Sequence, residues 1–191
     1  VIAEAEKEFN SGTGVGEMTM EFTIDASELA GKSVVAFEYL TQDGAQIAEH
    51  EDITDENQTV KFPEIGTTLT GDLGHTANAG AETITLTDKV SYKNLEVGKE
   101  YTLTGTLMDQ ETGEAITDAD GNPITATKTF VPVSEEGSTN VVFTFSGVDL
   151  AGKTVVAFEE VSKDGVLYAV HADIEDAAQT VYFPKVTTFA V

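Results

Sequence analysis

The sequence of 191 residues contains no cysteine. Disulfides, thiol nucleophiles and thiolate sites for zinc or iron–sulfur clusters are therefore excluded. Basic residues are also scarce: 10 lysines and arginines stand against 34 aspartates and glutamates, and the formal net charge is -24. So anionic a surface repels phosphate backbones and anionic lipids, and we expect no nucleic-acid partner.

Long apolar runs and metal-binding patterns are missing too. No apolar run approaches the ~20 residues of a membrane-spanning helix, so we expect no membrane insertion in this part of the protein. His50, His75 and His171 lack metal-ligand spacing, and residues 118–122 lack the Gly and Glu positions of a calcium loop. The sequence predicts no metal and no cofactor, and a hairpin turn at residues 118–122.

What the sequence does contain is a long internal repeat. Residues 29–63 align without a gap to residues 150–184 and are identical at 21 of 35 positions. A period of this length is that of a whole domain. We expect residues 1–63 to be the second half of one unit, residues 64–184 a complete unit, and residues 185–191 the opening strand of another. Neighbouring repeats of the same protein are thus the expected partners.

Alternation of polar and apolar residues predicts β-strands, for example at residues 83–87 and 142–145. Turn signals such as Asp164-Gly165 separate these segments. Residues 27–31 and 148–152 are expected to form one helical turn each at most. Many short strands with turns between them indicate an all-β fold, an immunoglobulin-like Greek-key β-sandwich in tandem repeats.

Among the polar residues kept in both copies, three pairs stand out, although solvent-facing positions between them differ. The pairs are Glu38 with Glu159, His50 with His171, and Gln58 with Gln179. Period two places Glu159 on the face of Val155 and Ala157, and either face of that strand remains a candidate for the core. On residue types alone, exposed positions are the commoner interpretation, because polar side chains are mostly exposed.

Four motifs of the complete unit occur together in one order. They are PEIGTT at 63–68, LTDKVSYKNL at 86–95, VAFE at 156–159 and HADIEDAAQTV at 171–181. This combination resembles the VaFE-repeat domains, which are the ester-bond domains in stalks of Gram-positive surface adhesins. The resemblance covers nearly all of residues 64–184, and residues 1–63 as a half copy.

The resemblance implies an intramolecular ester between a Thr on the first strand and a Gln on the last strand, formed with release of ammonia. Carried over by motif, the pair is Thr67 and Gln179, with Asp88, Glu159 and His171 in supporting roles. The implied product is a structural cross-link made in a single turnover, so we expect no enzyme. The implied location is an extracellular, cell-wall-anchored surface protein with its anchor outside this sequence and its host ligand unknown.

The residue types suit that chemistry. Thr67 shares its strand face with the apolar Ile65 and Leu69, whereas Thr68 points the other way. A Thr hydroxyl is a poor nucleophile at neutral pH, so a base must take its proton. His171 is expected to take this proton and to pass one to the leaving ammonia.

The two carboxyl groups have a separate expected role. If Asp88 and Glu159 lie close together they cannot both ionise easily, so they are expected to share a proton. The protonated acid would donate to the carbonyl oxygen of Gln179 and stabilise the oxyanion. Because an ester hydrolyses more readily than an amide, the site should be buried and dry. Which carboxyl holds the proton stays open at this point.

Residues 1–63 and 185–191, the two incomplete units, each lack one of the two partners for a Thr–Gln ester. The half copy keeps Glu38, His50 and Gln58 without a Thr strand of its own, and Thr188 has no Gln of its own. No ester is therefore expected within residues 1–63 alone.

Two alternatives remain open. One is a stalk domain with a Lys–Asn isopeptide, which would use Lys89 or Lys93. The other is a ligand-binding adhesin domain that reads a host protein or glycan through its loops.

Overall fold

The computed structural model describes residues 1–10, 12 and 14–189. In this part of the chain the regular elements are strands and two short 3-10 helices. None of the described helices has the length and apolar character to cross a membrane. The elements of residues 1–63 are β1 (Ser33–Val35), β2 (Glu38–Gln42), β3 (Ala45–His50), η1 (Glu56–Gln58) and β4 (Thr59–Lys61).

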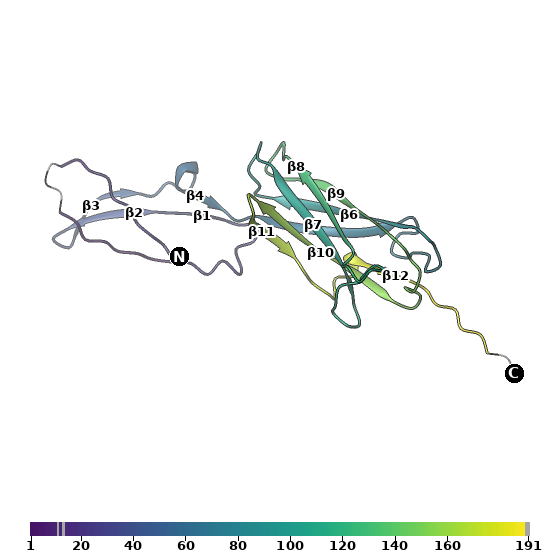
Figure 1. Ribbon diagram of the computed structural model, residues 1–191. Coiled ribbons are helices and arrows are strands. Elements are labelled where there is room, and N and C mark those ends of the chain that lie inside the picture. The colour runs from purple at the N-terminus through teal and green to yellow at the C-terminus, as the bar shows by residue number, and fades with distance from the viewer. Residues whose placement is uncertain (11, 13, 190–191) are drawn as a thin grey trace.

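The complete unit is a sandwich of two antiparallel sheets (Figure 1). Its elements are β5 (Glu64–Gly71), β6 (Ile84–Lys93), β7 (Tyr101–Asp109), β8 (Thr125–Phe130), β9 (Gly137–Phe145), β10 (Thr154–Lys163), β11 (Val166–His171), η2 (Ala177–Gln179) and β12 (Thr180–Tyr182). One sheet has the order β5-β6-β9, and the other has the order β11-β10-β7-β8 with β12 also paired to β10. The chain crosses between sheets after β6, β8 and β9. The expected all-β sandwich is confirmed.

The core lies between the sheets and follows the alternation of the sequence. On β6, every second residue from Ile84 to Tyr92 is buried and most of the intervening ones are exposed. Burying each large apolar side chain stabilises the fold by roughly 1.5–3 kcal/mol. Asp88 occupies the middle of this buried stripe, and that position calls for a specific explanation.

Turn chemistry fixes most connections. Asp164 and Gly165 both have positive φ, 51° and 77°, as a tight hairpin between β10 and β11 requires. In the predicted turn at residues 118–122, Oδ1 of Asp118 accepts the backbone N–H groups of Asp120 and Asn122, each at 2.9 Å. Among the described residues, no group of three or more His, Asp or Glu side chains is arranged to hold a metal ion.

The segments expected to form at most one helical turn stay within that limit, and the helices lie elsewhere. Residues 27–31 and 148–152 form hydrogen-bonded turns without a helical residue. The short helices lie instead at η1 and η2, which the sequence analysis did not predict. Each is too short to show a helical period, and an Asp side chain at its N-cap stabilises it.

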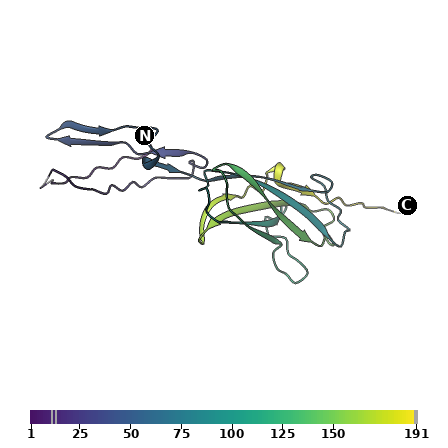
Figure 2. The same ribbon diagram turned by 90° about the horizontal axis from the view of Figure 1, so that it is seen from above.

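The two parts of the chain lie end to end, and Figure 2 shows the same arrangement from above. Asn94, directly after β6, reaches back across the junction. Its Nδ2 donates to the carbonyl oxygens of Phe62 (2.9 Å) and Lys32 (3.2 Å). Lys61 also forms an ion pair with Glu135. The junction is therefore held by side-chain contacts as well as by the chain itself.

Candidate functional site: a buried polar cluster between the sheets

Four polar side chains lie in the core of the complete unit. Thr67 is 8% exposed, and Asp88, Glu159 and Gln179 are 0% exposed. They come from β5, β6, β10 and the end of η2 respectively. Burying polar groups costs folding free energy unless they form hydrogen bonds with one another. The interpretation of Glu159 and Gln179 as exposed positions is therefore wrong.

Strand alternation turns Thr67 inward. Ile65, Thr67 and Leu69 are buried on one face of β5, and Thr68 faces outward. The backbone N–H of Thr68 donates to Oδ1 of Asp88 (3.0 Å) on the neighbouring strand. The Thr67 hydroxyl and the Asp88 carboxyl therefore lie on two neighbouring strands, β5 and β6.

The inner face of β10 carries Glu159. Val155, Ala157, Glu159 and Val161 all point into the core, which decides between the two faces left open by the sequence. Across the ladder to β7, Glu159 pairs with Gly105. Because Gly105 has no side chain, the buried ring of Phe143 packs directly against its backbone on that strand.

The position of Gln179 follows from an interruption in the sheet. β11 pairs with β10 from Lys163 up to Glu159, and β12 pairs with β10 from Val156 to Thr154. The chain therefore leaves the β10 edge at His171 and returns at Thr180. The turn η2 fills the interruption, packs against β5 and carries Gln179 inward.

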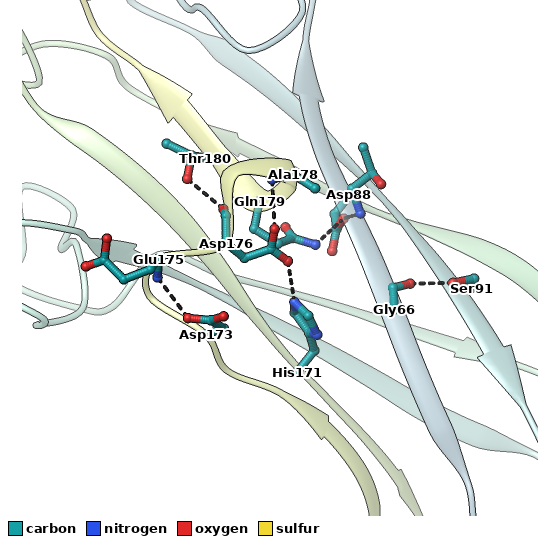
Figure 3. A network of polar contacts seen from close by, with 11 residues as sticks. Gly66, Asp88, Ser91, His171, Asp173, Glu175, Asp176, Ala178, Gln179 and Thr180 are labelled. Atoms are coloured by element: carbon teal, nitrogen blue, oxygen red, sulfur yellow. Dashed lines mark hydrogen bonds and ion pairs between the residues drawn. The ribbon is translucent and has the colours of Figure 1, made fainter. Parts of the chain in front are cut away.

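Hydrogen bonding in the cluster is incomplete. Nε2 of Gln179 donates to Oδ1 of Asp88 (3.3 Å), as Figure 3 shows. Several buried oxygens have no hydrogen-bond partner among the described residues: Oγ1 of Thr67, Oδ2 of Asp88, both carboxyl oxygens of Glu159 and Oε1 of Gln179. A buried polar atom without a partner costs about 1–3 kcal/mol. Proton sharing or covalent bonding among these atoms would remove much of that cost.

The electrostatics favour one protonated carboxyl. Burial raises the pKa of Glu159 to about 10, with further upward contributions from Asp88, while the Thr67 hydroxyl lowers it in part. Burial also raises the pKa of Asp88, but the neighbouring Glu159 carboxyl and the hydrogen bonds from Gln179 and the Thr68 backbone oppose the rise. Asp88 accepts two hydrogen bonds and Glu159 accepts none, so the proton belongs on Glu159.

His171 lies at the rim of the cluster rather than inside it. It pairs with Glu159 in the β10–β11 ladder, but its side chain is 23% exposed. Its Nε2 lies 2.8 Å from Oδ2 of Asp176, which Figure 3 shows directly above the ring. Within the described part of the chain, no hydrogen bond joins His171 to Thr67. His171, the expected base, therefore lies beside Glu159 in the sheet. Its hydrogen-bond partner is Asp176, which the sequence analysis did not single out.

Asp176 is that missed residue. Its signal was present in the repeat, because Asp55 occupies the same place in the half copy. The pairing recurs there, with Nε2 of His50 at 3.0 Å from Oδ2 of Asp55.

The half copy has the same register but an open site. Glu38 pairs with His50 as Glu159 pairs with His171. Glu38 and Gln58 are only partly buried and His50 is exposed. Thr188 is exposed and lies outside any strand. The predicted constellation therefore comes together only in the complete unit.

Sequence comparison agrees with this organisation. Residues 1–62 and residues 63–183 each match the T-Q ester bond containing domain. This chain belongs to that family. The resemblance to ester-bond domains is confirmed, and the T-Q domain is a structural cross-link domain. No curated protein sequence matches the chain significantly.

Solved structures add a comparison of the fold. An adhesin from Mobiluncus mulieris, which contains intramolecular disulfide, isopeptide and ester bond cross-links, is similar in two crystal forms. The TM-scores are 0.56 and 0.54 at 19% and 20% identity. Both alignments cover 65% of this chain and 58% of the adhesin chain. At this identity the likeness shows a shared fold.

Proposed function

We propose that the complete T-Q domain joins Thr67 to Gln179 through an ester and serves as a structural stalk module of a surface adhesin. The observation that carries the proposal is the buried cluster itself. An amide, a hydroxyl and a carboxyl whose pKa is raised by burial lie together in the core, and most of their oxygens have no hydrogen-bond partner. Such a cluster costs stability unless it reacts.

The proposed reaction is an acyl transfer. Oγ1 of Thr67 attacks the side-chain carbonyl carbon of Gln179, and His171 takes the hydroxyl proton. The proton on Glu159 is donated to Oε1 of Gln179 as negative charge develops there, and it returns to Glu159 when the carbonyl reforms. When the C–N bond breaks, the amide nitrogen leaves as ammonia with the proton held by His171. Asp88 holds the amide nitrogen through its Oδ1 before the reaction.

Burial explains why the reaction occurs once. Thr67, Asp88, Glu159 and Gln179 are all buried, so water has little access to the ester. Both reactants belong to the same chain, and each complete domain contains one pair. We therefore propose a single-turnover, autocatalytic cross-link and no catalysis on other molecules.

The positions of the two residues suit a load-bearing role. Thr67 lies on β5, the first strand of the domain, and Gln179 precedes β12, the last strand. A bond between them joins the first and last strands covalently, so tension along the chain does not have to be carried by the noncovalent contacts of the core. This supports a stalk of repeats on a Gram-positive cell surface, anchored to the cell wall and with neighbouring repeats as partners.

The isopeptide alternative finds no support in the geometry. Lys89 and Lys93 both point to the outer face of β6, away from Asp88 and the core. Their ammonium groups therefore lie on the solvent side of the sheet.

Mass spectrometry of the folded chain tests the proposal. The wild-type chain should be lighter than its sequence by one ammonia, and digestion should yield a linked peptide pair that contains Thr67 and Gln179. Thr67→Ala should abolish both signals. Thr68→Ala is the matched control, because Thr68 is exposed and its backbone N–H is retained. A wild-type mass equal to the sequence mass would refute the ester.

A further inference from the structure

We propose that Asp176 is a positioning residue for ester formation, which orients the ring of His171 and holds the turn that delivers Gln179. This inference rests on the proposed function. Asp176 touches neither reacting atom, so its effect passes through the two residues it holds.

Asp176 contacts both of them at once (Figure 3). Its Oδ2 lies 2.8 Å from Nε2 of His171, and its Oδ1 accepts the backbone N–H of Ala178 at 2.8 Å. Its carbonyl oxygen accepts the backbone N–H of Gln179 (3.1 Å) and the hydroxyl of Thr180 (2.7 Å). One residue thereby links the end of β11, the turn η2 and the start of β12.

The carboxylate also fixes which nitrogen of His171 is basic. Burial raises the pKa of Asp176, but hydrogen bonds from Ala178 and His171 outweigh this and hold it below its ordinary value. An ionised carboxylate only accepts hydrogen bonds, so Nε2 of His171 must carry the proton. In the neutral ring the other nitrogen, Nδ1, then carries the lone pair that can act as a base.

The half copy shows that this arrangement is local. Asp55 makes the same four contacts: with Nε2 of His50 at 3.0 Å, the backbone N–H of Asn57 at 2.8 Å, the backbone N–H of Gln58 at 3.2 Å and the hydroxyl of Thr59 at 2.7 Å. The half copy has no closed polar cluster, yet the network forms. The pattern of His, Asp, Gln and Thr therefore forms this network even where no closed cluster is present.

Asp176→Asn tests the proposal with little change in shape. Asn still caps η2, but its amide nitrogen donates toward Nε2 and favours the proton on Nδ1. The linked fraction is followed by mass after cell-free synthesis. We expect ester formation to slow by at least about tenfold. Asp55→Asn is the matched control and should leave the rate unchanged.

A second measurement shows directly which nitrogen of the His171 ring carries the proton. In Thr67→Ala, which cannot form the ester, nitrogen NMR of His171 should show the proton on Nε2, and Asp176→Asn should move it to Nδ1. Asp176→Ser keeps a cap without the carboxylate, so it should slow the reaction too. It replaces Asp176→Asn if that variant does not fold.

The outcomes separate the two proposals. A wild-type chain that links while Asp176→Asn links at the same rate overturns the role of Asp176 alone. A proton on Nδ1 in Thr67→Ala also overturns it. A wild-type chain that never loses ammonia overturns the proposed function, and the NMR result still decides whether Asp176 orients His171.

Discussion

Glu159 and His171 face each other in the last pair of the β10–β11 ladder, beside the point where η2 enters the sheet. The acid and the base thus sit on adjacent strands of one rigid sheet. Gln179 arrives between this sheet and β5, which carries Thr67. The reactants are therefore brought together by folding itself, so ester formation should follow folding and should not precede it.

The first prediction concerns stability. Closing a loop of ~110 residues is worth about 4 to 5 kcal/mol in the chain-entropy model. Thr67→Ala should lower the free energy of unfolding by about that amount in guanidinium titrations. Thr68→Ala should stay within about 0.5 kcal/mol of wild type, as surface substitutions usually do. Equal midpoints for wild type and Thr67→Ala would count against a formed cross-link.

The second prediction concerns pH. With its pKa raised from 4.5 to about 10, Glu159 keeps a proton in the folded state that the unfolded chain releases. Stability of the unlinked Thr67→Ala chain should therefore be full below about pH 4.5 and fall toward pH 10, by up to about 1.4 kcal/mol per pH unit.

Adding Glu159→Gln to Thr67→Ala should flatten most of this slope, because Gln has no proton to lose. The residual slope belongs to Asp88, whose pKa is also raised by burial. Urea denaturation of both chains across the pH range gives the comparison. An unchanged slope in the double variant would show that Glu159 is already ionised in the folded state.

The third prediction concerns Gly105, which pairs with Glu159. A Cβ at this position would lie 2.5 Å from Cζ of Phe143, whose ring is fully buried. Gly105→Ala should therefore destabilise the Thr67→Ala chain by about 1–3 kcal/mol through overpacking. In the reactive chain it should also slow linkage, because displacement of the Phe143 ring disturbs the space beside Glu159. Thermal unfolding and intact mass measure the two effects, and a neutral result would mean that the ring moves freely.

The fourth prediction distinguishes ester from amide. After denaturation, hydroxylamine should cleave the link and restore a linear chain, with a hydroxamate at position 179. The folded chain should resist the same treatment because the cluster excludes solvent. A link that survives hydroxylamine in the denatured chain would favour an isopeptide instead.

Much of the site follows from period two in the sequence. Alternation placed Thr67 on the inner face of β5 and separated it from Thr68, and the structure agrees. For Glu159 the pattern left two faces, since Val and Ala on one face and Val and Phe on the other are both apolar. Only packing against β7 and the opposing sheet decides between them.

Two other features of the site, the helix η2 and the contact between His171 and Asp176, leave no periodic pattern in the sequence. The turn η2 is shorter than one α-helical repeat, and its place between β11 and β12 depends on pairing with β10. The contact between His171 and Asp176 depends on side-chain direction, which spacing along the chain does not give. The repeat did contain the clue, because Asp55 and Asp176 are kept together with their histidines.

The reach of Asn94 back to the carbonyls of Lys32 and Phe62 bears on how far such a protein extends. A flexible tether between domains gives an end-to-end distance that grows only as the square root of its length. A joint fixed by hydrogen bonds keeps successive domains in line. The height of a row of domains then rises in direct proportion to their number.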